Sequence, residues 1–212
     1  MSNRVYLYCT DFPGMPAESQ SEDFFKASGT EYEAKACVPL FWMCLFSSSD
    51  IKLLPADHNG FDDDSRPYAY LFCSKAAGIE RLTRRSEMLK DALGPDRHAL
   101  YLAWIERLKS EPFQNVLVKT EEIDWMGQEG ELEGTLRKAY KHFEAARQQE
   151  GFQMSNAMND IAGLWEDETL NTCESYELVG VANTAQQWPP RFSKQPERHP
   201  APPKKSKWLF WK

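Results

Sequence analysis

The 212-residue sequence has no apolar run long enough to cross a membrane. Its longest apolar stretch, Val38 to Phe46, has nine residues, about half of what a membrane-spanning helix requires. The opening residues, MSNRVYLYCTD, contain no apolar segment of the kind that a secretory signal needs. We therefore expect a cytoplasmic protein with no transmembrane segment.

Cysteine and histidine are too few and too scattered for a disulfide framework or a zinc site. The five cysteines are odd in number and no two stand at C-x-x-C spacing, and the four histidines pair neither with one another nor with cysteine at a zinc spacing. Most of the cysteines have apolar neighbours, which is typical of buried thiols in a reducing compartment. We expect no metal and no cofactor.

Glycine-rich catalytic motifs are also missing. The 11 glycines are dispersed, without a G-x-S-x-G elbow or a phosphate-binding loop. Cys9 follows a predicted strand, but the sequence places no histidine or cation beside it to lower its pKa, so a structural role is favoured. An enzyme with an unrecognised site, using Cys9 or the carboxylates near Glu121, remains an alternative.

Charge is divided unevenly along the chain, whose formal net charge is −7. Residues 1–185 carry 18 basic and 31 acidic side chains, a net charge of −13, whereas residues 186–212 carry seven basic side chains and one acidic one, a net charge of +6. Because phosphate affinity needs a basic surface on the folded domain, the acidic body argues against direct nucleic-acid binding. Protein binding is the function class that remains.

The C-terminal part also has its own composition. Six of the 13 prolines lie after residue 185, so we divide the chain into a globular domain, 1–185, and a basic, proline-rich tail, 186–212. The tail ends in an aromatic cluster whose candidate contact residues are Trp208, Phe210 and Trp211. It is a disordered tail, a membrane contact, an adaptor segment that inserts into a partner, or an arm that folds back on the acidic body.

Residue patterning predicts a small sheet packed with several amphipathic helices, an α+β (or α/β) fold. We expect strands at 5–8, 68–74, 116–119 and 176–181, and loops at 15–30 and 55–67. We expect helices at 31–48, 75–93, from Asp96 through Leu108, at 131–149 and at 152–165, with Gly94-Pro95 ending the second of them.

An acidic cluster between residues 121 and 133 is the strongest candidate for a partner-binding site. Glu121, Glu122 and Asp124 precede Trp125, so carboxylates that steer a basic partner stand beside a side chain typical of interface hot spots. The competing interpretations are a solvent-facing helix start, where acidic residues favour the helix dipole, and paired catalytic carboxylates. We rank catalysis below the other two.

A second acidic segment follows residue 56. The order Asp57-His58-Asn59-Gly60 resembles the start of a calcium loop, but Asp62 stands where the loop needs glycine and Tyr68 where it needs glutamate. We interpret the segment as a solvated acidic turn, and we take Asp62, Asp63 and Asp64 as secondary partner-binding candidates.

Three arginines, Arg81, Arg84 and Arg85, lie three and four residues apart on the predicted helix 75–93 and so share a face. A nucleic-acid patch is conceivable there, but the net charge of the body argues against it. We expect a solvated face that pairs with acidic side chains.

The opening Asn3-Arg4-Val5-Tyr6-Leu7-Tyr8 resembles the start of a group of uncharacterised bacterial cytosolic proteins. These begin N-R-S-Y-L-Y and continue, after a polar loop, into a segment like Y-x-x-P-L-[FLY]-x-x-L, here residues 37–45. The resemblance covers roughly the first 80 residues and departs at Val5, where the group has serine.

Proteins of this group resemble the immunity proteins of polymorphic toxin systems, which are acidic domains that bind and block one cognate toxin. The resemblance implies a non-catalytic inhibitor with no catalytic residues to carry over. The partner it implies is a protein toxin, and an acidic inhibitor suits a toxin with a basic active-site cleft.

Overall fold

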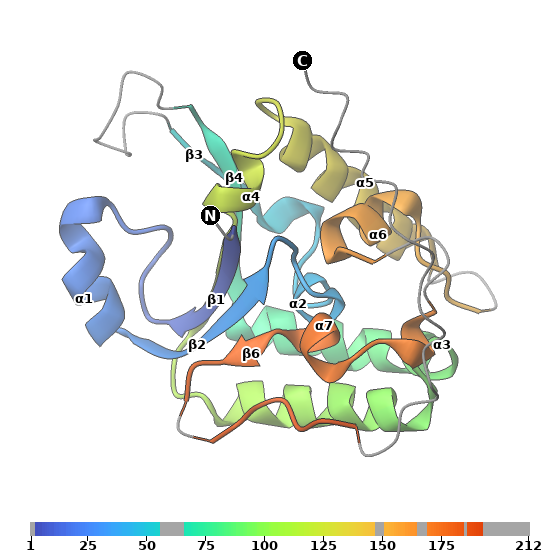
Figure 1. The fold of residues 1–212 in the computed structure, drawn as a ribbon. Coiled ribbons are helices and arrows are strands. Elements are labelled where there is room, and N and C mark those ends of the chain that lie inside the picture. Colours follow the sequence, from blue (N-terminus) through green and yellow to red (C-terminus); the bar gives the residue numbers. More distant parts are fainter. Residues whose placement is uncertain (1–2, 56–65, 147–150, 165–168, 185, 193–212) are drawn as a thin grey trace.

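A six-stranded antiparallel sheet forms the centre of the molecule. The computed structural model describes residues 3–55, 66–146, 151–164, 169–184 and 186–192 (Figure 1). The strand order is β3-β4-β5-β1-β2-β6 and every neighbouring pair is antiparallel. The strands are β1 (Arg4–Thr10), β2 (Ser28–Lys35), β3 (Ile51–Leu54), β4 (Tyr68–Ser74), β5 (Asn115–Lys119) and β6 (Val181–Ala182). The predicted α+β class is confirmed.

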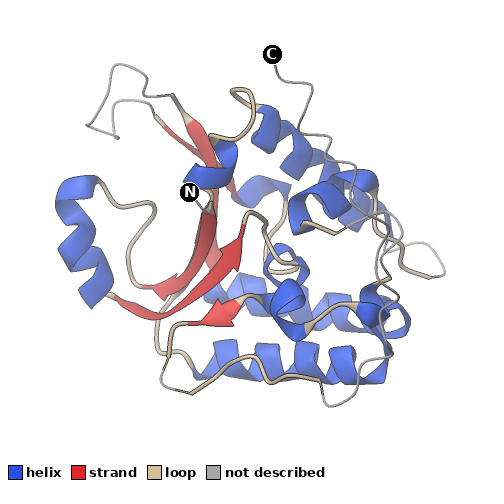
Figure 2. Ribbon diagram, viewed as in Figure 1, coloured by secondary structure: helices blue, strands red, loops and turns tan. Residues whose placement is uncertain are grey.

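The helices lie mainly on one side of this sheet, with α1 on the other (Figure 2). The α-helices are α1 (Ser21–Lys26), α2 (Leu40–Met43), α3 (Lys75–Ser110), α4 (Glu121–Asp124), α5 (Glu131–Ala146), α6 (Asn156–Ala162) and α7 (Ser175–Val179). Short 3₁₀ helices are η1 (Glu18–Gln20), η2 (Ser48–Asp50) and η4 (Leu170–Thr172). No helix in the described ranges is long and apolar enough to span a membrane.

Alternation along the strands produces two cores of unequal size. In β1, Val5, Leu7 and Cys9 face the large helical core, whereas Tyr8 belongs to a smaller cluster on the face that α1 covers. That smaller cluster consists of Tyr8, Phe24, Leu54, Tyr68, Tyr70 and Leu117. Both faces of the central strands are therefore buried, and both are rich in aromatic rings.

A buried turn around α2 replaces most of the helix expected over 31–48. Within 31–35, Tyr32 and Ala34 face the core while Glu31 and Glu33 face away, which is the period of a strand, and this stretch forms β2. Pro39 then starts the four-residue helix α2, and residues 40–46 are completely buried. The helix prediction was wrong because a single apolar run hid two different elements.

Arg85 hydrogen-bonds to this buried turn. Its Nη1 donates to the carbonyl oxygens of Met43, Cys44 and Phe46 at 3.4, 2.9 and 2.8 Å, and its guanidinium carbon lies 4.5 Å from the ring centroid of Phe143. A short helix leaves its last carbonyls without amide partners, so they need donors from elsewhere. The prediction of a solvated arginine face is wrong for Arg85, which is buried.

The two arginines beside it differ in their surroundings. Arg81 donates to Leu45 O at 3.0 Å and forms an ion pair with Asp50 at 3.0 Å. Arg84 is exposed, 3.8 Å from Glu80 on the same helix. Both therefore pair with acidic residues, as expected, but only Arg84 does so in solvent.

The helix α3 folds back on itself at Gly94. Gly94 has φ 68° and ψ 174°, and Pro95 begins the second half, as the predicted helix stop requires. The Tyr101 hydroxyl donates to Leu82 O at 2.9 Å, although 19 residues of straight helix would separate them by about 28 Å. The two halves are thus a helical hairpin that returns the chain from β4 to the neighbouring β5 (Figure 1).

The remaining differences from the predicted elements are local. The expected strand at 176–181 is helix α7 followed by the two-residue strand β6, because Glu177 caps the start of α7 through the backbone N–H of Glu174. The expected loop at 15–30 contains η1, α1 and the start of β2. The helices expected at 131–149 and 152–165 are α5 and α6, which are shorter in the described residues.

Gly180 is the glycine whose replacement tests this packing. Its φ of 70° and ψ of −164° suit glycine alone, and an added Cβ would lie 2.6 Å from the Trp42 ring and 2.7 Å from Glu33 O. We expect Gly180→Ala to lower the free energy of unfolding by about 1–3 kcal/mol or more, measured by urea denaturation.

Gly134 is the matched control, since it lies in α5 and an added Cβ there would meet nothing within 4 Å. Gly134→Ala should raise stability by about 0.5–1 kcal/mol. Equal effects of the two substitutions would contradict the packing described for Gly180.

Candidate functional site

Asp124 anchors the short helix α4 to the sheet. The residue is 2% exposed, and its Oδ2 accepts from the backbone N–H of Ala69 at 3.2 Å. Arg66 reaches Asp124 Oδ1 at 3.4 Å, donates to Asp124 O, and donates to Gly127 O at 3.0 Å. Asp124 is therefore placed inside the protein, where it holds α4 and the following turn, and not on a surface that a partner can touch.

Glu121 and Glu122 lie on the surface, and each has one interaction within the chain. Glu121 Oε2 is 2.8 Å from Lys119 Nζ. Glu122 Oε2 accepts from the backbone N–H of Arg4 at 2.7 Å, which joins α4 to the first strand. Each carboxylate therefore has one partner within the chain.

Trp125 and Met126 follow α4 and are exposed by 44% and 46%. The Arg66 guanidinium carbon lies 5.6 Å from the centroid of the Trp125 ring. Arg66 also hydrogen-bonds to Asp124 and to Gly127 O, so the cation that contacts the Trp125 ring has partners of its own in the protein. The indole is thus partly exposed to solvent and has the Arg66 guanidinium close to its ring.

Further carboxylates follow this exposed pair in the chain, between residues 129 and 133. Glu131 Oε2 accepts from the backbone N–H of Gln128 at 2.8 Å, and Glu133 lies 2.8 Å from Arg137 on α5. Glu129, which precedes both, is exposed. We call this group, which is exposed apart from the half-buried Glu121, the Trp125 surface; it consists of Glu121, Glu122, Trp125, Met126, Glu129 and Glu131. An apolar centre with a charged edge is the usual anatomy of a protein interface.

Two members of this arrangement were absent from the sequence prediction. Met126 carries no signal beyond its place next to Trp125, and Arg66 stands 58 residues before Asp124. Only the fold brings Arg66 beneath the indole. The other predicted contacts, Asp62, Asp63, Asp64, Trp208, Phe210 and Trp211, lie outside the described residues.

Cys9, the candidate nucleophile, is in the core. It is fully buried, and burial raises the pKa of its thiol to about 12. A thiol with that pKa stays protonated at neutral pH, and the thiolate is the reactive form. Within the ranges that the structure describes, no group of three or more His, Cys, Asp or Glu side chains is arranged to hold a metal ion.

No protein-family model, no curated protein and no solved structure matches the chain.

The buried carboxyl of Asp124 generates a prediction about pH. Burial raises its pKa above the ordinary value, so ionisation costs more in the folded state than in the unfolded state. Relative to Asp124→Asn, the wild type should be most stable below a pH of about 4 and should lose that advantage as pH rises through the raised pKa. Urea unfolding of both proteins across this range measures the difference.

Asp124→Ala serves as the control for the hydrogen bonds. It leaves the Ala69 N–H without its acceptor and should cost about 1–3 kcal/mol at every pH. A wild-type advantage over Asp124→Asn that grows with pH would contradict the burial described here.

Proposed function

We propose that this protein is a non-catalytic binding domain, most concretely a bacterial immunity protein that neutralises a cognate toxin by covering its active site. The supporting observation is the Trp125 surface, where a pre-positioned indole and an exposed methionine stand among carboxylates. Trp is among the residues that carry most of the binding energy at protein interfaces, when a partner buries it in a fitted pocket.

Rigidity favours binding at this surface. Association costs free energy when flexible side chains must be ordered, and a ring already held against Arg66 loses less freedom than a free one. Asp124 contributes indirectly, because its hydrogen bonds fix both Arg66 and α4. Its role in binding is therefore to position the surface rather than to touch the partner.

The negative charge of this protein indicates that its partner has a basic surface. Residues 1–185 have a net charge of −13, and the carboxylates around Trp125 concentrate negative charge at the place where the apolar anchor is exposed. Such a field accelerates the approach of a basic surface and disfavours an acidic one. A toxin that cuts or modifies nucleic acid needs a basic cleft, so its active site is the surface that this protein would cover.

Co-expression tests the proposal. Each protein encoded beside this gene is expressed in a laboratory host, alone and together with the chain. We expect one neighbour to arrest growth, the chain to restore it, and the two purified proteins to form a complex. If no neighbour is toxic, or if a toxic one is not neutralised, the immunity proposal fails.

Substitution of Trp125 locates the interface. We expect Trp125→Ala to weaken the complex by about 30-fold, measured by calorimetry. Phe25→Ala is the matched control, because Phe25 is an exposed aromatic residue (59%) on α1 and far from α4 in the fold. Equal effects of the two substitutions would remove Trp125 from the interface.

Neutralisation of the surrounding carboxylates tests the steering. The variant Glu121→Gln/Glu122→Gln/Glu129→Gln should slow association by about 10-fold at low salt, and the effect should shrink as salt is added. The control Glu80→Gln/Glu87→Gln/Glu106→Gln changes the same charge at exposed positions of α3. A global charge effect would slow both variants equally and contradict a local one.

Truncation after Phe192 separates this proposal from an adaptor role for residues 193–212. An inhibitor that binds through the Trp125 surface keeps its partner without these residues, whereas an adaptor working through the tail loses it. The cut is placed after Phe192 because Trp188 and Phe192 pack against the core.

A further inference from the structure

The segment Gln186–Phe192, which we call the C-terminal strap, is fastened along the second half of α3. The Arg107 guanidinium lies 5.1 Å from the Trp188 ring centroid, and the Arg97 guanidinium lies 4.6 Å from that of Phe192. The backbone N–H of Ala182 also donates to Trp188 O at 2.9 Å, which ties the strap to β6. The strap is thus part of the folded body.

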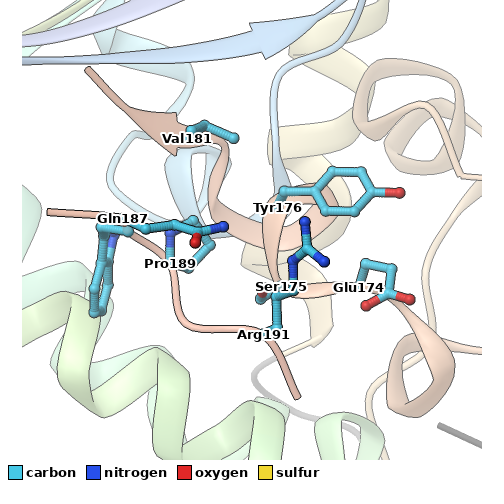
Figure 3. A pocket seen from close by; sticks show the side chains of 8 residues that line it. Glu174, Ser175, Tyr176, Val181, Gln187, Pro189 and Arg191 are labelled. Carbon is cyan, nitrogen blue, oxygen red and sulfur yellow. The ribbon is translucent and has the colours of Figure 1, made fainter. Parts of the chain in front are cut away.

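Between the strap, α7 and β6 lies a cavity of about 340 Å³ (Figure 3). Val181 and Pro189 form apolar parts of its wall, and Tyr176 and Arg191 stand on the opposite side. The full lining is Glu174, Ser175, Tyr176, Val181, Gln187, Trp188, Pro189 and Arg191. This volume is at the lower end of the range for ligand pockets, so it suits a small metabolite rather than a nucleotide.

Two opposite charges line this cavity without pairing. Arg191 forms no ion pair with Glu174 or with any other residue that the structure describes, and Glu174 forms none either. Across the exposed surface of the protein, by contrast, most arginines described have a carboxylate partner, as in Arg84–Glu80 and Arg137–Glu133. A cation and an anion held apart in one cavity match a ligand that carries both charges.

Ser175 adds a polar group to the wall. Only 2% of this residue is exposed, and it lines the cavity beside Glu174. A hydroxyl at this position can donate to or accept from the polar end of a ligand.

We propose that this cavity binds a free α-amino acid with an apolar side chain. The ligand carboxylate pairs with Arg191, the ammonium group pairs with Glu174, and the side chain packs against Val181 and Pro189. Ser175 hydrogen-bonds to the polar end. A dianion such as a phosphate monoester is disfavoured, because a single guanidinium faces it and Glu174 repels it. This site is separate from the Trp125 surface and does not depend on the function proposed for it.

Three ligands that share a phenyl ring test the contributions of the ammonium and carboxylate groups one at a time. L-Phenylalanine carries both charged groups, 3-phenylpropionate lacks the ammonium group, and 2-phenylethylamine lacks the carboxylate; L-leucine provides a smaller side chain. Titration calorimetry on the full chain should show one of the two amino acids binding at least about 10-fold more tightly than either singly charged analogue. Binding of neither amino acid, or equal binding of all three phenyl compounds, overturns the proposal.

Matched variants assign each charge to its residue. Arg191→Gln should weaken amino-acid binding by about 10-fold and leave 2-phenylethylamine unchanged, whereas Glu174→Gln should weaken the amino acid and leave 3-phenylpropionate unchanged. Arg84→Gln, on an exposed part of α3, removes the same charge away from the cavity and should change nothing. Loss of binding in Arg84→Gln, or full binding in Arg191→Gln, assigns the ligand elsewhere and overturns the site.

Discussion

The fold depends on one arginine that completes the hydrogen bonding of a turn buried in the core. Residues 40–46 have no exposed surface, and a four-residue helix cannot satisfy the carbonyls that follow it. Arg85 donates to three of these carbonyls from α3, and Phe143 of α5 packs on its guanidinium. Burying a cation without acceptors costs free energy, and so does burying carbonyls without donors. The hydrogen bonds between the Arg85 guanidinium and these carbonyls reduce both costs. The turn, α3 and α5 are held together at this point.

Local patterns predicted the elements whose neighbours in sequence are also their neighbours in space. The strand at 68–74, the helix after it and the break at Gly94-Pro95 follow from alternation, spacing and backbone chemistry. The apolar run at 38–46 was misassigned because its conformation is set by Arg85 and by Val179, which accepts a hydrogen bond from the Trp42 indole. No window of sequence contains both partners, so periodicity alone could not find this turn.

The candidate site likewise has features that the sequence indicated and features that only the fold creates. Composition drew attention to the segment around Trp125 as a partner-binding candidate, and the structure exposes the indole there. Sequence could not show that Asp124 points inward while Glu121 and Glu122 remain at the surface, because a four-residue helix has too few turns to define a face. Nor could it show Arg66 beneath the indole. The cavity under the C-terminal strap was not predicted although its lining lies within residues 174–191, because this stretch was expected to be a strand followed by a tail and not a helix, a short strand and a packed strap.

The hydrogen bond of the Trp42 indole joins residues far apart in sequence, and this separation affects the order of folding during synthesis. Its hydrogen-bond acceptor, Val179, lies 137 residues further on, and the outer neighbour of β2 is formed by residues 181 and 182. During translation, the N-terminal strands and the buried turn therefore emerge long before the segment that closes over them. A nascent chain shorter than about 182 residues exposes the edge of β2 and the Trp42 side of the core, so the body cannot be completed before residues 179–182 have been made. Until then the unpaired backbone groups along that edge of β2 are open to pairing with another strand.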